Sequence, residues 1–221
     1  MANTLVRASQ SLNLSEKRIM MAAIAKMAGV STGEVKITAE EYANSFDLPI
    51  KQAYDQLKEA AENIYQRSIS LSKEDSKGKI HTKFRWIAGY KYHDGMGFIS
   101  LGFTNYVIPY LVDLQEQFTK YRLQQAGALR SIYSWRLLEL LTQQSSGWLL
   151  ISIEDFHHAM DTPKSRRNNF GRLRIDVIEP AVNELRNKDG WLIEWLPIKS
   201  GRKVTQLRFD FKKDPQGKLD I

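Results

Sequence analysis

The sequence predicts an α+β fold of two tandem winged helix-turn-helix domains that are related by internal duplication. Three observations support this prediction. A thirteen-residue segment recurs without a gap at an offset of 114 residues, amphipathic helical patterns flank both copies, and a β-hairpin pattern follows each group of helices.

The repeated segment is ITAEEYANSFDLP at residues 37–49 and ISIEDFHHAMDTP at residues 151–163. Thr38 and Ser152 are expected to be N-caps, because a hydroxyl can accept a free backbone N–H at a helix start. An acid follows three residues later, so Glu41 completes a capping box and Asp155 is a shorter imitation of one. Each copy ends in proline, and the residue before proline avoids the helical region. We therefore expect a short helix and then a turn in each copy, and duplication explains the match better than chance.

The flanking segments extend the repeat into two similar domains. Apolar residues at helical spacing predict helices at residues 14–27 and 131–144 before the copies, and at 49–64 and 169–185 after them. Hairpins are predicted at 79–92 with 98–103 and at 191–198 with 204–211. Three helices followed by a hairpin is the order of a winged helix-turn-helix domain. The predicted domains are residues 1–120 and 121–221, joined by a helical segment at 111–125.

Pro180 lies inside the last predicted helix. A proline in a helix interior removes a hydrogen bond and destabilises the helix by about 3 kcal/mol. Two arrangements remain open: the helix kinks at Pro180, or a second helical segment begins with Pro180 in its first turn.

Composition favours a polyanionic partner. The net charge is +7 and the pI is about 9.5. Residues 1–120 contain 15 Lys/Arg and 13 Asp/Glu, whereas residues 121–221 contain 17 and 12, so the second half is the better candidate for the main contact. The chain has no cysteine, which excludes disulfides, thiolate metal sites and a cysteine nucleophile. Without an apolar run of membrane-spanning length or a signal-peptide pattern, we expect a cytoplasmic bacterial protein with no membrane contact.

The strongest candidate DNA-binding segment is KSRRNNFGRLR, residues 164–174, at the start of the second recognition helix. The N-terminal part of such a helix enters the major groove, where cations meet phosphates and Arg or Asn can read base edges. We expect Arg172 to project away from the apolar stripe and Arg174 to lie at its edge. The alternative is a solvated, charged loop. The DNA-binding role would fail if Arg166, Arg167 and Arg172 were paired with carboxylates of the chain itself and no continuous positive surface lay beside the hairpin. The candidates here are Lys164, Arg166 and Arg167 in the turn before the helix, Asn168 or Asn169 as its cap, and Arg172 and Arg174.

Two further groups of residues are weaker candidates for DNA contact. The tip of the second hairpin, KSGRK, offers Lys199, Arg202 and Lys203 to phosphate or to a minor groove. In the first half, Lys51 and Gln52 begin the equivalent helix, but neighbouring acids offset their charge, so we expect weaker DNA contact there or a protein–protein role.

Several motifs together resemble a known family. NTLVRASQSLNLSEKRI, SIYSWRLLELL, FGRLRIDVIEPAVNEL and GRKVTQLRFDF, within residues 3–211, resemble in order and spacing the iteron-type plasmid replication initiators with paired winged-helix domains. The resemblance implies that monomers bind direct repeats at an origin, help to open the duplex, and recruit the host initiator and replicative helicase. It also implies dimers, joined through the first domain, that bind an operator inverted repeat and repress their own gene.

The resemblance also bears on single residues. The second domain would dominate DNA recognition, with Ser131 near phosphate, whereas Arg136 could lie near phosphate or form an internal ion pair. Ile175 and Asp176 stand where family members often have a basic pair, so the family's base preference does not carry over.

Other functional classes require residues or properties that can be compared with this sequence. A rolling-circle initiator needs two histidines one residue apart to bind metal, but the histidines are His81, His93, His157 and His158, and the adjacent pair is expected to lie partly exposed on the surface. No P-loop spacing occurs, so we expect no enzymatic activity, cofactor or metal. A winged-helix transcriptional regulator without initiator activity would share every DNA-binding feature, and a module binding acidic protein would lack the steep salt dependence of phosphate contacts.

Overall fold

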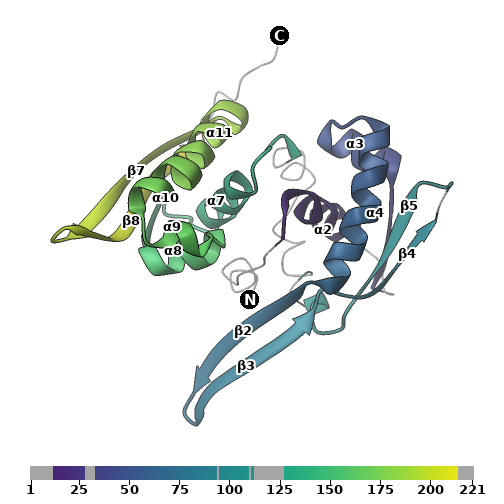
Figure 1. Cartoon of the computed structure of the whole chain (residues 1–221), viewed down its shortest axis with the longest axis horizontal. Coiled ribbons are helices and arrows are strands. Elements are labelled where there is room, and N and C mark those ends of the chain that lie inside the picture. The colour runs from purple at the N-terminus through teal and green to yellow at the C-terminus, as the bar shows by residue number, and fades with distance from the viewer. Residues whose placement is uncertain (1–11, 28–32, 94, 110, 112–126, 214–221) are drawn as a thin grey trace. The chain divides into compact units, whose positions relative to one another are not determined.

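The computed structural model describes residues 12–27, 33–93, 95–109, 111 and 127–213 (Figure 1). The chain divides into two compact units, Met1–Ala128 and Leu129–Ile221. The predicted boundary near residue 120 and the predicted connecting helix from residue 112 onward lie outside the described residues.

The first unit combines helices with two separate antiparallel sheets. Its three-stranded sheet has the order β1-β5-β4, and β2 pairs only with β3. The elements in chain order are α2 (Leu14–Lys26), β1 (Glu34–Thr38), α3 (Ala39–Phe46), α4 (Ile50–Gln66), β2 (Ser68–Asp75), β3 (Gly78–Arg85), β4 (Ile87–His93) and β5 (Phe98–Phe103).

The second unit repeats this plan without the extra pair of strands. Its sheet has the order β6-β8-β7, so in both units the strand before the second helix pairs with the last strand. This shared order confirms the predicted α+β fold of two winged-helix domains. The elements are α7 (Ile132–Thr142), β6 (Trp148–Ser152), α8 (Ile153–Met160), α9 (Lys164–Arg167), α10 (Phe170–Leu173), the π-helix η1 (Arg174–Ile178), α11 (Glu179–Asp189), β7 (Trp191–Ser200) and β8 (Lys203–Lys213).

The repeated segment folds as its side chains predict. In the first copy the Glu41 N–H donates to Thr38 Oγ1 (3.1 Å) and the Thr38 N–H donates to Glu41 Oε2 (2.9 Å), which completes the capping box. In the second copy the Asp155 N–H donates to Ser152 Oγ (3.0 Å), but the shorter Asp155 carboxylate accepts from the serine hydroxyl. Both short helices end at an aspartate in the left-handed region, with φ of 49° at Asp47 and 47° at Asp161.

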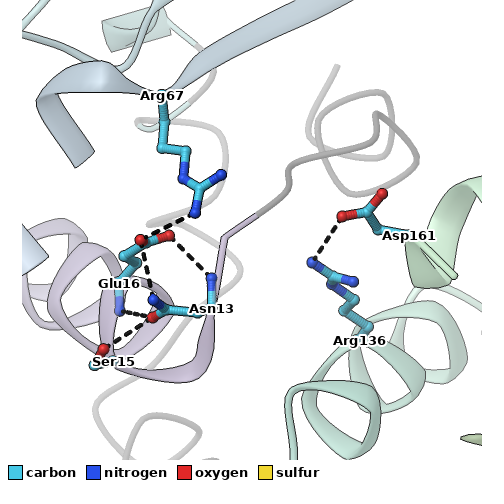
Figure 2. A network of polar contacts seen from close by, with 6 residues as sticks. All are labelled: Asn13, Ser15, Glu16, Arg67, Arg136 and Asp161. Carbon is cyan, nitrogen blue, oxygen red and sulfur yellow. Dashed lines mark hydrogen bonds and ion pairs between the residues drawn. The ribbon is translucent and has the colours of Figure 1, made fainter. Parts of the chain in front are cut away.

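A polar network around the buried Glu16 fixes the start of α2 (Figure 2). Asn13 and Glu16 form a capping box, in which the Asn13 N–H donates to Glu16 Oε2 (2.9 Å). Glu16 is fully buried, and Arg67 Nη2 lies 3.2 Å from its Oε1. Arg67 directly follows α4, so this ion pair ties the start of α2 to the end of α4.

The structure differs from the predicted elements in three respects. The short strands β1 and β6 were not expected, because each has only five residues before a strong helix-capping signal. Residues 79–92 were predicted as one strand, but this is wrong: Trp86, only 2% exposed, separates β3 from β4. β3 pairs with β2, which the serine-rich segment 68–75 did not suggest.

Candidate nucleic-acid interface

The recognition segment of the second unit, residues 164–189, consists of the short helix α9 and a continuous helical run of α10, η1 and α11. Lys164, Arg166 and Arg167 were expected in a turn, but the structure places them in the one-turn helix α9. Asn168 ends α9, so of the two candidate caps it is Asn169 that caps the next helix, where its Oδ1 accepts from the Arg172 N–H (3.0 Å). Asn169 and Arg172, the two residues joined by this cap, are both exposed to solvent.

The π-helix η1 accommodates Pro180. The Glu179 N–H donates to the Arg174 carbonyl, five residues back, instead of the usual four. Pro180 then lies in the first turn of α11, where its missing N–H leaves no donor unpaired. α10, η1 and α11 follow one another without a gap, so Pro180 is accommodated by a π-turn inside one continuous helical run, and no separate segment begins there.

The cations of this segment differ in the contacts that they make within the protein. Arg166 pairs with Asp176 (Nε–Oδ2 3.0 Å), and Arg167 Nε donates to the Thr162 carbonyl (2.9 Å). Arg174 lies at the exposed edge of the helix, as expected, and pairs with Glu179 (2.6 Å).

Lys164 and Arg172 remain available. Both are exposed, and within the described part of the chain neither has a carboxylate partner. Of Arg166, Arg167 and Arg172, which must not all be paired with carboxylates, only Arg166 is; Arg174, at the edge, pairs with Glu179. The segment is therefore not an internally neutralised loop.

The hairpin of β7 and β8 presents a second group of cations. Lys199, Arg202 and Lys203 are all exposed around its turn. Gly201 has φ of 61°, a left-handed conformation that glycine adopts without strain. The tip can therefore bring three positive charges against a polyanion.

The start of α7 is already occupied by a carboxylate. Glu184 of α11 accepts from the Arg130 N–H (2.7 Å) and the Ser131 N–H (3.1 Å), and Ser131 Oγ accepts from the Tyr133 N–H (3.1 Å). Burial alone raises the pKa of Glu184, but hydrogen bonds from Ser134 and from these backbone groups lower it below its ordinary value. Ser131 remains a predicted phosphate contact, although Glu184 fills the site that a phosphate would take at this helix start.

Arg136 lies inside the second unit. It is buried, its Nη1 donates to the Met160 carbonyl (2.5 Å), and its Nη2 lies 3.8 Å from Asp161 Oδ2 (Figure 2). Of the two roles left open, the structure supports the internal ion pair. Arg136 thus holds the end of α8, from which the recognition segment departs.

Lys51 and Gln52 are exposed in the first turn of α4, as a groove contact requires. Pro49 stands at the N-cap position and makes no side-chain cap. Asp55 and Glu59 lie further along the same helix, so acidic side chains offset the positive charge of its first turn, as the sequence predicts.

The histidine pair is not a surface pair, which corrects the prediction. His157 is buried with its Nδ1 2.6 Å from Thr162 Oγ1, and only His158 is exposed. Burial, and then the nearby Arg167 charge, lower the pKa of His157. In the described residues, no group of three or more His, Cys, Asp or Glu side chains is placed to hold a metal ion.

Sequence reasoning missed two supporting residues of this site. Thr162 accepts Arg167 at its carbonyl and contacts His157 through its hydroxyl, and Asp176 restrains Arg166. Thr162 stands at the position of Leu48 in the first copy, and this polar replacement within the repeat was the available signal.

Comparisons with known proteins agree with this architecture. Residues 1–142 match the family described as Initiator Replication protein, WH1, and residues 152–211 match Initiator Rep protein, WH2. The PI protein of Escherichia coli is 26% identical over 96% of this chain and 81% of its own length. A replication initiation protein of Escherichia coli is also 26% identical, over 82% of this chain and 57% of its own.

Among solved structures, the crystal structure of Pi initiator protein in complex with iteron DNA shares the fold. It has a TM-score of 0.75 and 23% identity, and the match covers 96% of each chain. In the described residues, no helix has both the length and the apolar character needed to cross a membrane.

Proposed function

Because the chain belongs to the Initiator Replication protein family with WH1 and WH2 domains, we propose that it binds repeated DNA sequences at a plasmid origin and initiates replication there. The observation that carries the proposal is the exposed start of the recognition segment. Lys164 and Arg172 project there with no carboxylate partner among the residues that the structure describes, and a wing with three exposed cations belongs to the same unit. The relatives support it, since the Pi initiator protein binds iteron DNA.

In the proposed complex the start of α10 lies in the major groove. Arg172 reads a base edge, while Lys164, Arg166, Arg167 and Arg174 meet phosphates beside the groove. Asn169 holds the helix start in place as its cap. The wing residues Lys199, Arg202 and Lys203 contact phosphate or the neighbouring minor groove, and Ser131 is a further candidate phosphate contact.

The first unit has a supporting role in this proposal. Lys51 and Gln52 make weaker contacts at the start of α4, and the same unit joins two copies into a homodimer. Monomers bind direct repeats, promote opening of the duplex, and recruit the host initiator and replicative helicase in the bacterial cytoplasm. Dimers bind an operator inverted repeat and repress the gene. The protein acts by binding, without catalysis of its own.

The proposal is tested in two steps. Selection of binding sites from a random duplex library with the full chain should enrich a sequence of about two helical turns, since two groove-reading modules would each cover about one turn. The gene and its adjacent DNA should then allow an otherwise non-replicating plasmid to propagate. Enrichment without propagation would favour a transcriptional regulator, and the absence of any enriched sequence would refute specific DNA recognition.

A further inference from the structure

The first unit carries a two-stranded ribbon that the second unit lacks. The ribbon is β2 and β3, residues 68–85, and it pairs with no strand of the three-stranded sheet. In the second unit α11 passes into its hairpin through Gly190 alone. The winged-helix fold therefore does not require the ribbon. Figure 1 shows it extending away from α4 and from the other sheet of its unit.

The two faces of the ribbon have different chemistry. Ile69, Leu71, Ile80 and Phe84 share one face, where Ile69 is fully buried at the root and Phe84 stacks on Tyr106 (5.9 Å). Alternate residues of β3 point to the opposite face. That face carries the cationic row, which we define as the cations Lys79, Lys83 and Arg85 together with His81 between them, all exposed.

The ribbon accounts for the positive charge of the N-terminal half. Residues 68–85 contain five Lys/Arg and two Asp/Glu, whereas the rest of residues 1–120 contains ten and eleven. Ser68 and Ser70 stand opposite Arg85 and Lys83 on the neighbouring strand, whereas Glu74 stands opposite Lys79. Three of the five cations therefore share one projecting face with a single acid.

The spacing of the row fits a nucleic-acid backbone. Alternate residues of an antiparallel strand are about 6.8 Å apart, because each residue rises about 3.4 Å. One strand of B-DNA places a phosphate about every 3.4 Å along its axis. Because the phosphates wind around that axis, a straight row meets a few of them where the strand crosses it, and its regularly spaced side chains suit such a repeating polyanion.

The ribbon lies far from the groove-reading part of its own unit. Lys51 and Gln52 are at the start of α4, and the ribbon begins just beyond its end. A helix of 17 residues is about 25 Å long. A contact made by the row is thus separate from any contact made by the start of α4.

We infer that the cationic row binds the phosphate backbone of duplex DNA as a sequence-independent contact, distinct from the recognition segment. The apolar face gives the ribbon its anchorage at the root, and Arg67, which joins α4 to β2, fixes the root through Glu16. The inference goes beyond the proposed function, since it requires no specific sequence.

The test compares two double variants of the full chain. Lys79→Gln with Lys83→Gln removes two charges from the row, and Lys36→Gln with Lys91→Gln removes two exposed lysines from the three-stranded sheet of the same unit. Affinity for a random-sequence 30-base-pair duplex is measured by fluorescence anisotropy at several salt concentrations. Both variants should melt near the wild-type temperature, because all four side chains are exposed and the contacts of Lys36 with Phe98 and of Lys91 with Glu34 lie at the surface.

The row variant should lower the slope of log affinity against log salt by about 1.8, since each phosphate contact contributes about 0.9. The loss of affinity between 50 and 200 mM salt then shrinks about twelvefold relative to wild type. Lys83→Gln alone should give about half the change in slope, and the sheet variant should give little.

Three results would overturn the inference. The slope of the row variant could equal that of wild type, or both double variants could lower it equally, which would indicate a general effect of net charge. The row variant could instead keep its slope and lose self-association in sedimentation, which would make the ribbon a surface between copies. Failure of the proposed function is seen separately, as a wild-type chain that does not prefer its selected sequence over the random duplex.

Discussion

Asp176 restrains the recognition segment, so replacing it should strengthen DNA binding. Its carboxylate lies 3.0 Å from Arg166 Nε, and the two side chains are 28% and 35% exposed. A pair this exposed contributes at most about 1 kcal/mol, which Arg166 gives up when it turns to a phosphate. A carboxylate about 7 Å from a phosphate in water also repels it by about 0.6 kcal/mol. Asp176→Asn removes both effects and keeps the side-chain shape, so the dissociation constant should fall about tenfold.

The matched control for this variant is Asp210→Asn. Asp210 pairs with Arg208 (2.8 Å) on the exposed face of the β6-β8-β7 sheet, so the control also removes one carboxylate and releases one arginine. Fluorescence anisotropy with the selected duplex and a random duplex, at one salt concentration, should show a large gain for Asp176→Asn on both and a smaller gain for the control. Weaker binding confined to the selected duplex would refute the reasoning, because it would mean that Asp176 orients Arg166 toward a base. Equal affinities for variant and wild type would mean that Arg166 does not reach DNA.

Four further predictions concern single side chains. Arg172→Ala should weaken binding to the selected duplex by about 1–3 kcal/mol, and an equal loss on the random duplex would reduce Arg172 to a phosphate contact. Lys203→Ala should lower the salt slope by about one, whereas an unchanged slope would remove the wing tip from the interface. Ile175 is 60% exposed on the recognition segment and is expected to contact a thymine methyl, so Ile175→Ala should abolish the sensitivity of binding to a thymine-to-deoxyuridine exchange; insensitivity of wild type at every thymine would contradict this. His157 has a lowered pKa from burial and the charge of Arg167, so the unfolded chain takes up the proton first and stability falls as pH drops below about 6.5; His157→Gln should flatten the urea midpoint between pH 7 and pH 5, and a wild-type slope in that variant would assign the effect elsewhere.

The features that the sequence predicted well are those decided within a few residues. The N-caps Thr38 and Ser152 bond to N–H groups three residues away, and the turns at Asp47 and Asp161 follow from the proline two residues later. The second hairpin was also predicted, because its strands alternate apolar and polar side chains around a glycine turn. Local hydrogen bonds and side-chain alternation are properties that a short window of sequence contains.

The features that it did not predict depend on contacts between distant segments. The π-turn that accommodates Pro180 inside a continuous helix leaves no mark in the apolar pattern of the sequence. Arg166 and Asp176 are ten residues apart across a helix break, so no regular helical spacing brings them together. His157 is polar by composition but buried, because Thr162 supplies a partner within the core.

The duplication itself indicates where the two units have acquired different roles. The capping residues and the buried aromatics Tyr42 and Phe156 remain similar at an offset of 114, because the fold needs them. The outer face of the sheet has changed, since Glu34 and Lys36 of the first unit correspond to Trp148 and Leu150 of the second. The larger changes lie after the second helix of each unit, where one copy has a continuous α4 and a ribbon and the other has a broken, cationic recognition segment. The scaffold is shared, and the divergence is concentrated at these two projecting features. This pattern is expected if each unit contacts DNA through a different element. Each contact can therefore be removed by substitutions that leave the other contact unchanged.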